Sequence, residues 1–126
     1  MADEEPTFRI PQRPTRRYPA RNGVKYEGKT VFTLRPASDR DDGLLTDLVE
    51  SVLGRTPYRY GDWFNLPMPL YLVHDDETGD TFRVTVRDGT VELHVLPETE
   101  PAGLRDFYRR LDDASNTTWT VTCRTE

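Results

Sequence analysis

Two alternating segments, residues 81–87 and 90–96, flank Asp88-Gly89 and constrain the fold more than any other part of the chain. Asp and Gly tolerate the two positive φ angles of a type I′ turn, so this dipeptide predicts a β-hairpin. The turn sets the pairing register. Apolar residues then pair on one face: Val86 with Val91, Val84 with Leu93 and Phe82 with Val95. Polar residues lie on the other face: Arg83, Thr85, Arg87, Glu92 and His94. We therefore expect a half-buried antiparallel sheet.

The rest of the chain predicts two amphipathic helices and further strands. Apolar residues recur at helical spacing from Leu44 to Leu53, after a run of aspartates and before Gly54, which suits a helix end. A second apolar stripe follows Thr99 and Pro101. Strands are predicted at residues 24–26, 30–34 and 70–73 and after residue 116, and the first two are expected to form a hairpin.

These elements predict an α+β fold with a mostly antiparallel sheet of about five to six strands and two helices packed on one face. The expected order is β-β-α-β-β-β-α-β, preceded by an extended basic arm. Residues 1–22 are the predicted Arg/Pro-rich arm, and residues 23–126 are the predicted single domain. A chain of 126 residues can bury such a core without disulfides, and the one cysteine, Cys123, is expected to be a buried structural thiol.

Charge is divided unevenly along the chain. Residues 6–25 carry six cations, four prolines and no acid, whereas residues 38–126 carry nine arginines and eighteen acids. Prolines favour an extended arm, and the arginine fork binds phosphate or carboxylate groups. We expect the arm to dock on a partner or on its own acidic body. The predicted contact residues are Phe8, Arg9, Ile10, Arg13, Arg16, Arg17, Tyr18 and Arg21.

Aromatic residues gather in a second region, residues 55–69, among glycine and prolines that predict a long loop. These aromatic side chains either complete the core at the end of the sheet or form a second contact surface. The candidate residues of that surface are Arg55, Tyr58, Arg59, Tyr60, Trp63 and Phe64.

No residue pattern identifies a reaction: the chain has neither a Walker A sequence nor a Gly-x-Ser-x-Gly elbow. The favoured hypothesis is a small non-enzymatic binding protein that docks on a protein partner or on its own oligomer, a homodimer included. Binding of RNA or a ribonucleoprotein through the same arm is the alternative. A minor alternative is a small enzyme that uses His74 or His94 with Asp75. No cofactor or metal is expected, because the acidic segment after His74 is typical of a solvated turn.

No signal peptide or membrane span is recognised, which favours a cytoplasmic location and no membrane partner. Fifteen arginines, two lysines and thirteen aspartates are typical of salt-adapted proteins, so solvation in concentrated salt accounts for the acidic body. In molar salt the Debye length falls to about 3 Å, and only close contacts to a partner would persist.

Overall fold

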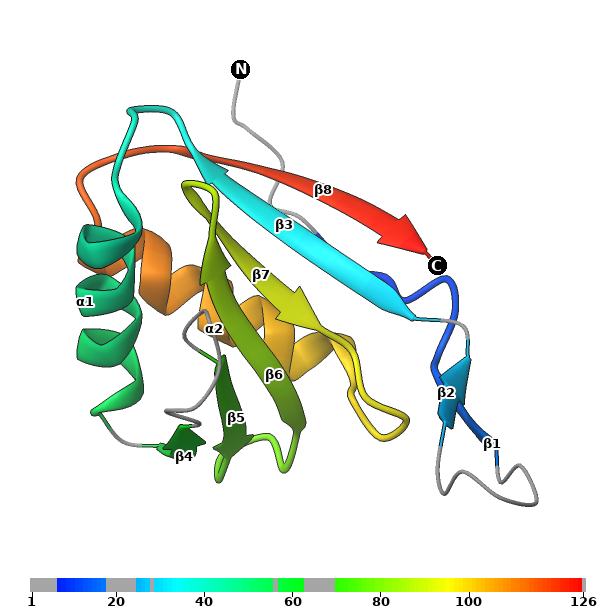
Figure 1. The fold of residues 1–126 in the computed structure, drawn as a ribbon. Coiled ribbons are helices and arrows are strands. Elements are labelled where there is room, and N and C mark those ends of the chain that lie inside the picture. The colour runs from blue at the N-terminus through cyan, green and yellow to red at the C-terminus, as the bar shows by residue number, and fades with distance from the viewer. Residues whose placement is uncertain (1–6, 18–24, 28, 56, 63–69, 126) are drawn as a thin grey trace.

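A computed structural model describes residues 7–17, 25–27, 29–55, 57–62 and 70–125, which form ten elements (Figure 1). The elements are β1 (Thr15–Arg17), β2 (Lys25–Glu27), β3 (Thr30–Pro36), α1 (Asp42–Leu53), β4 (Tyr58–Asp62), β5 (Leu70–Asp75), β6 (Thr81–Arg87), β7 (Thr90–His94), α2 (Pro101–Ala114) and β8 (Trp119–Thr125). The predicted α+β fold class and the order of strands and helices are confirmed. The structure adds two short strands, β1 and β4.

Six of the strands form one antiparallel sheet in the order β4-β5-β6-β7-β3-β8. Both helices pack on the same face of this sheet (Figure 1). The last strand pairs with β3 along seven residues, from Thr30 opposite Thr125 to Pro36 opposite Trp119. Segments from the two halves of the chain thus lie side by side at this edge. Because both helices cover one face, the opposite face of the sheet has no helix layer (Figure 1).

The hairpin at Asp88-Gly89 has the predicted geometry. Asp88 has a φ of 53° and Gly89 a φ of 72°, the two positive values that a type I′ turn requires. Val86 pairs with Val91. The turn is also fastened to the first helix, because the Gly89 amide donates to Oδ1 of Asp42 at 2.8 Å. The register of β6 and β7, and with it the face on which each side chain lies, is therefore fixed at the centre of the sheet.

The hydrophobic core lies between the sheet and the helices. Its largest fully buried side chains come from both layers: Phe82, Phe107, Leu34, Leu45, Leu53, Leu93, Leu104 and Leu111. Burial of each such side chain contributes about 1.5–3 kcal/mol. Strand residues alternate between this core and the opposite face, so the sequence pattern of the strands determines what the uncovered face presents.

Local hydrogen bonds fix where both helices begin. Asp41 caps α1 as expected, with Oδ1 accepting from the Leu44 amide at 2.8 Å. At the start of α2, Oδ2 of buried Asp80 accepts from the Gly103 amide at 2.7 Å. A Cβ atom at Gly103 would lie 2.5 Å from the Asp80 side chain, so this close approach of α2 to the turn before β6 requires glycine.

Two local predictions were wrong. The hairpin expected between residues 24–26 and 30–34 does not form: β2 pairs with β1, and β3 pairs with β7 and β8. The long apolar β3 strand gains more from a position inside the six-stranded sheet, where both of its edges are paired. The region expected to be a long loop contains the edge strand β4, which pairs with β5. The predicted boundary between arm and domain falls outside the described residues.

Candidate binding surface

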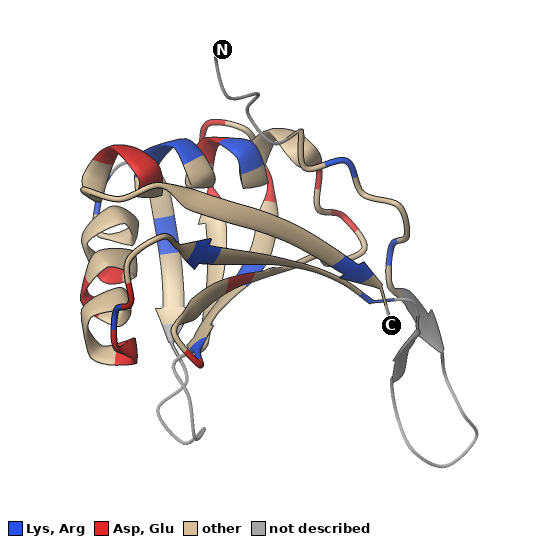
Figure 2. Cartoon of the chain, turned by 90° about the horizontal axis from the view of Figure 1, so that it is seen from above, with Lys and Arg blue, Asp and Glu red and all other residues tan. Residues whose placement is uncertain are grey.

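The face of the six-stranded sheet that the helices leave uncovered, called the open face here, collects the arginines of the sheet. Side chains alternate between the two faces along each strand, and residues paired across neighbouring strands point to the same face. The pairing of β3 to β8 therefore shows which residues share the open face. Every arginine of these six strands lies on the open face: Arg35, Arg59, Arg83, Arg87 and Arg124. Figure 2 shows Lys and Arg along the strands, whereas α1 carries only acidic charge and α2 carries both signs. The acidic domain therefore has one basic face.

A single buried carboxylate, Glu92, lies at the centre of the open face. Its side chain is only 5 % exposed, and it accepts a hydrogen bond from the Thr85 hydroxyl at 3.1 Å. The two Glu92 oxygens also pair with Arg87 Nε at 3.3 Å and Arg124 Nη1 at 3.2 Å. One negative charge thus holds two guanidinium groups, and the cluster keeps an excess of positive charge.

His94 belongs to the same cluster. Its Nε2 atom lies 3.1 Å from the Thr85 hydroxyl oxygen and 3.6 Å from Oε1 of Glu92. Burial lowers the pKa of His94, and this effect outweighs the opposing influence of Glu92, while Arg124, Arg83 and Arg87 lower the pKa further. The imidazole is therefore neutral at neutral pH, and a nearby anion would favour its protonation.

The remaining arginines of the open face differ in their partners. Arg59 is paired with Asp76, with Nη2 and Oδ1 2.7 Å apart. Arg35 and Arg83 are exposed and form no ion pair with a carboxylate of the described residues. These two guanidinium groups can contact an external anion without first breaking an internal pair.

The side chains between the arginines are mostly hydroxyls. Threonines on the open face come from four strands: Thr33, Thr81, Thr85, Thr90, Thr120 and Thr122. In the described residues of the six strands, the aromatic side chains lie on the helix side instead: Phe32, Tyr58, Tyr60, Tyr71, Phe82 and Trp119. The open face therefore offers positive charge and the hydroxyls of its exposed threonines, Thr120 and Thr122, and it carries no Phe, Tyr or Trp side chain in this part of the chain.

The described part of the predicted arm packs on its own domain. Phe8 is only 2 % exposed, and its ring centroid lies 5.1 Å from that of Phe32 and 5.5 Å from that of Tyr108. Ile10 packs against the same core. Arg13 donates to the Thr99 carbonyl oxygen and pairs with Glu100 at 3.1 Å. The described residues of the arm thus contact their own domain through the apolar side chains of Phe8 and Ile10 and through Arg13.

The other arm residues of the predicted contact set are only partly described. Arg9 is exposed. Arg16 and Arg17 lie in β1, opposite Tyr26 and Lys25 of β2. Tyr18 and Arg21 lie outside the described residues. The assignment of these arm residues to a partner stays a prediction.

The second predicted surface is divided by the structure. Tyr58 is buried and its ring packs edge to face on Phe107, with centroids 6.0 Å apart. Tyr60 is 40 % exposed and packs on Tyr71. Arg55 is exposed, and Arg59 belongs to the open face. The last two residues of this set, Trp63 and Phe64, are not among the described residues.

Tyr58 also anchors a polar cluster on the helix side that no local sequence pattern predicts. Arg110 Nη1 donates to the Tyr58 hydroxyl at 2.9 Å, and its guanidinium lies over the ring at 5.1 Å. The same Nη1 is 3.9 Å from Oδ2 of buried Asp75. Burial raises the pKa of Tyr58 to about 12 although the Arg110 hydrogen bond opposes this shift. The cluster joins β4 and β5 to α2.

The residues considered for catalysis are not brought together. His74 lies on the open face, where Nδ1 is 3.0 Å from the Thr81 hydroxyl oxygen. Asp75 is on the opposite face and accepts from the Glu77 and Thr78 amides through Oδ1. Cys123 is exposed rather than buried, so that expectation was wrong. Although it lies on the helix-side face, its strand is at the edge of the sheet.

Within the described ranges, no group of three or more His, Cys, Asp or Glu side chains is arranged to hold a metal ion. Neither of the described helices is long and apolar enough to cross a membrane. No family model, curated protein or solved structure matches the chain.

Proposed function

We propose that this protein is a non-enzymatic binding protein whose open face docks on the phosphate backbone of a nucleic acid duplex. The supporting observation is the placement of all five sheet arginines on the face that the helices leave uncovered. Guanidinium groups bind phosphate oxygens in a bidentate manner, and threonine hydroxyls are common donors to the same groups. The basic arm would add cations to this contact.

The composition of the open face favours a nucleic acid over a protein partner. The centres of protein interfaces are depleted of charged residues, whereas protein–DNA interfaces are polar and strongly positive. Here the centre consists of Glu92 and its three partners, Thr85, Arg87 and Arg124. The sequence favours a protein partner or a second copy of the chain instead. Binding to either one is a possible result of the test described below.

The described open face carries no Phe, Tyr or Trp side chain, and this favours a duplex over a single strand. Proteins that bind single strands usually stack the bases on aromatic rings, and each stacked base contributes about 1–3 kcal/mol. Recognition by phosphate contacts alone requires only cations at suitable positions on a broad surface. Six strands at about 4.8 Å spacing provide such a surface.

The test compares two double variants by fluorescence anisotropy with labelled duplex DNA and duplex RNA at low and at molar salt. Arg35→Gln with Arg83→Gln removes the two exposed arginines of the open face that have no ion pair with a described carboxylate. Arg105→Gln with Arg109→Gln removes the same charge from α2 and serves as the control. Each charged hydrogen bond contributes about 1.5–3 kcal/mol, so we expect the open-face variant to bind at least roughly tenfold more weakly.

Two results would overturn the proposal. One is the absence of duplex binding by the intact protein even at low salt. The other is equal weakening by the open-face and α2 variants, which would indicate a general charge effect. A change of oligomeric mass in the open-face variant, with no duplex binding by either protein, would point to self-association instead.

A further inference from the structure

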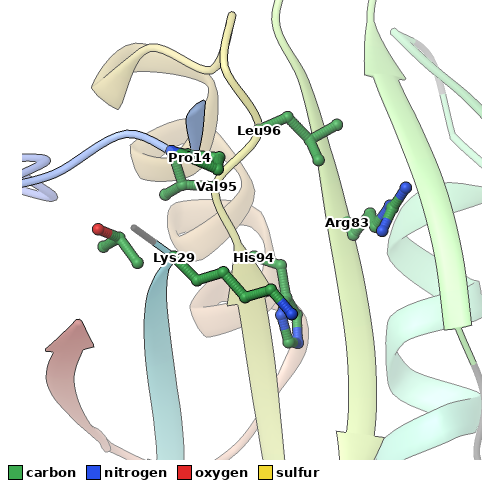
Figure 3. Close-up of a pocket in the computed structure, with 7 residues that line it drawn as sticks. Pro14, Lys29, Arg83, His94, Val95 and Leu96 are labelled. Carbon is green, nitrogen blue, oxygen red and sulfur yellow. The ribbon is translucent and has the colours of Figure 1, made fainter. Parts of the chain in front are cut away.

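A small cleft lies at one end of the open face, beside the described part of the arm (Figure 3). It is lined by Pro14, Lys29, Thr30, Arg83, His94, Val95 and Leu96 and encloses about 120 Å³. The Lys29 side chain extends toward the His94 ring, and Arg83 stands on the neighbouring strand (Figure 3). Pro14, Val95 and Leu96 form an apolar wall at the end of the cleft.

The cleft gathers three basic side chains and no acidic one. Lys29 and Arg83 are exposed and form no ion pair with the carboxylates that the structure describes. The arm limits the cleft from one side, because Pro14 is buried and the Thr30 hydroxyl donates to the Gln12 carbonyl oxygen. A charged concavity of this kind, in a chain with a net charge of −5, is suited to an anionic ligand.

The volume of the cleft restricts what it can hold. One water molecule takes about 30 Å³ of the liquid, so the cleft has room for a group the size of a few waters. That is sufficient for a phosphate group. The rest of a larger ligand would have to lie outside, over the open face.

We propose that this cleft is a phosphate subsite in which Lys29 and His94 hold one phosphate group, while Arg83, whose guanidinium is directed away from them over the neighbouring strand (Figure 3), adds positive charge at the edge of the cleft. That group belongs either to free phosphate or to the end of a nucleic acid strand, and the second source rests on the proposed function. Donors from two different segments suit a tetrahedral anion with several acceptor oxygens, whereas a carboxylate is satisfied by a single arginine fork. The Thr85 hydroxyl donates to Glu92 and therefore accepts from Nε2 of His94, so the other ring nitrogen, Nδ1, is left to take up a proton and donate to the ligand.

Ligand binding in the cleft should be coupled to proton uptake. Glu92 of β7 favours the charged imidazole of His94, whereas Arg83 and Arg87 of β6 and Arg124 of β8 oppose it, and burial lowers the pKa below 6.5. Lys29, which reaches the ring from the segment before β3, adds positive charge on the same side. An anion in the cleft would screen these cations and raise the pKa of His94, so affinity should rise as the pH falls toward that pKa.

The chain has only two histidines, His74 and His94, which permits a direct test by proton NMR of the imidazole ring signals. Phosphate, sulfate and chloride are added separately at equal ionic strength, and both ring pKa values are followed. We expect phosphate and sulfate to raise the pKa of His94, and chloride to leave it unchanged. His74, which contacts Thr81 and Asp76 elsewhere on the open face, is the internal control.

Lys29→Gln is the decisive variant, because Lys29 is exposed and its loss should not disturb the fold. We expect the variant to bind sulfate roughly tenfold more weakly, since one charged contact is lost. An Arg40→Gln variant provides the matched charge control away from the cleft. Equal responses of His74 and His94, or an unchanged affinity in the Lys29 variant, would overturn the proposal.

Duplexes with a 5′-phosphate and with a 5′-hydroxyl end distinguish the two sources of the group. Preference for the phosphorylated end, lost in Lys29→Gln, assigns the cleft to nucleic acid ends. If the ions bind in the cleft but neither duplex binds, the cleft takes free phosphate and the proposed function fails. If both duplexes bind and no ion affects His94, the proposed function stands and the subsite does not.

Discussion

At the scale of single residues, Glu92 determines how much positive charge the open face offers to a partner. A carboxylate that is almost fully buried on an otherwise uncovered face requires compensation, and it receives three donors from Thr85, Arg87 and Arg124. The same contacts occupy two of the five sheet arginines. Glu92 therefore stabilises the surface and at the same time competes with any external anion for its guanidinium groups.

Glu92→Gln should separate these two effects. The amide keeps the shape and can still hydrogen-bond, but it no longer attracts Arg87 and Arg124 as a charge. We expect the free energy of unfolding to fall by about 1–3 kcal/mol, because Arg87 and Arg124 lose the negative charge with which they pair. Under the proposed function, the variant should nevertheless bind duplex severalfold more tightly. Urea unfolding and anisotropy titrations measure the two changes.

Glu50→Gln on the exposed side of α1 is the control for this substitution, because it removes the same charge from the helix layer. Its stability and affinity should remain close to those of the parent protein. Weaker duplex binding by Glu92→Gln would indicate that Glu92 positions the arginines for the partner rather than competing with it.

At the scale of elements, the described arm belongs to the hydrophobic core rather than being a free appendage. Phe8 adopts a positive φ of 56°, an uncommon conformation for a bulky residue, and its ring fills the space between β3 and α2. Arg13 then fastens the chain to the segment before α2. Deletion of the arm would therefore remove core packing as well as cations, so it cannot test partner binding by itself.

Phe8→Ala should lower the free energy of unfolding by about 3–5 kcal/mol, since it removes a buried aromatic side chain that contacts two other rings. Arg9→Ala, at the adjacent exposed position, should change stability by less than about 0.5 kcal/mol. Thermal and urea unfolding of both variants measure the difference. Equal stability of the two variants would contradict the placement of Phe8 in the core.

The elements also show what local sequence patterns could predict. The hairpin at Asp88-Gly89 and the stripes of both helices were predictable, because turn chemistry and periodicity are local properties. The partner of β2 and the strand β4 were not, since strand pairing depends on the competition between distant segments. Arg83, Arg87 and Glu92 were assigned to one face from the hairpin alone. Arg35 and Arg124 could join them only once β3 was known to lie between β7 and β8.

At the scale of the whole molecule, the fold separates charges that are mixed along the sequence. The chain has a net charge of −5, and α1 carries three acids and no base: Asp42, Asp47 and Glu50. The open face carries five arginines against one glutamate in its strands. Because α1 and the open face lie on opposite sides of the sheet, the net charge of the chain is a poor guide to the partner of this protein. A negative protein can present a positive surface to a polyanion.

The salt dependence of duplex binding measures how many of these cations reach phosphates. Lys29, Arg35 and Arg83 have no ion pair with the described carboxylates, so about three phosphate contacts are expected. The logarithm of affinity should then fall with the logarithm of salt concentration with a slope of roughly −3. Arg35→Gln should make the slope shallower by about one unit, whereas Arg109→Gln in α2 should leave it unchanged. A slope near zero, or an equal change in both variants, would show that the open face does not contact the phosphate backbone.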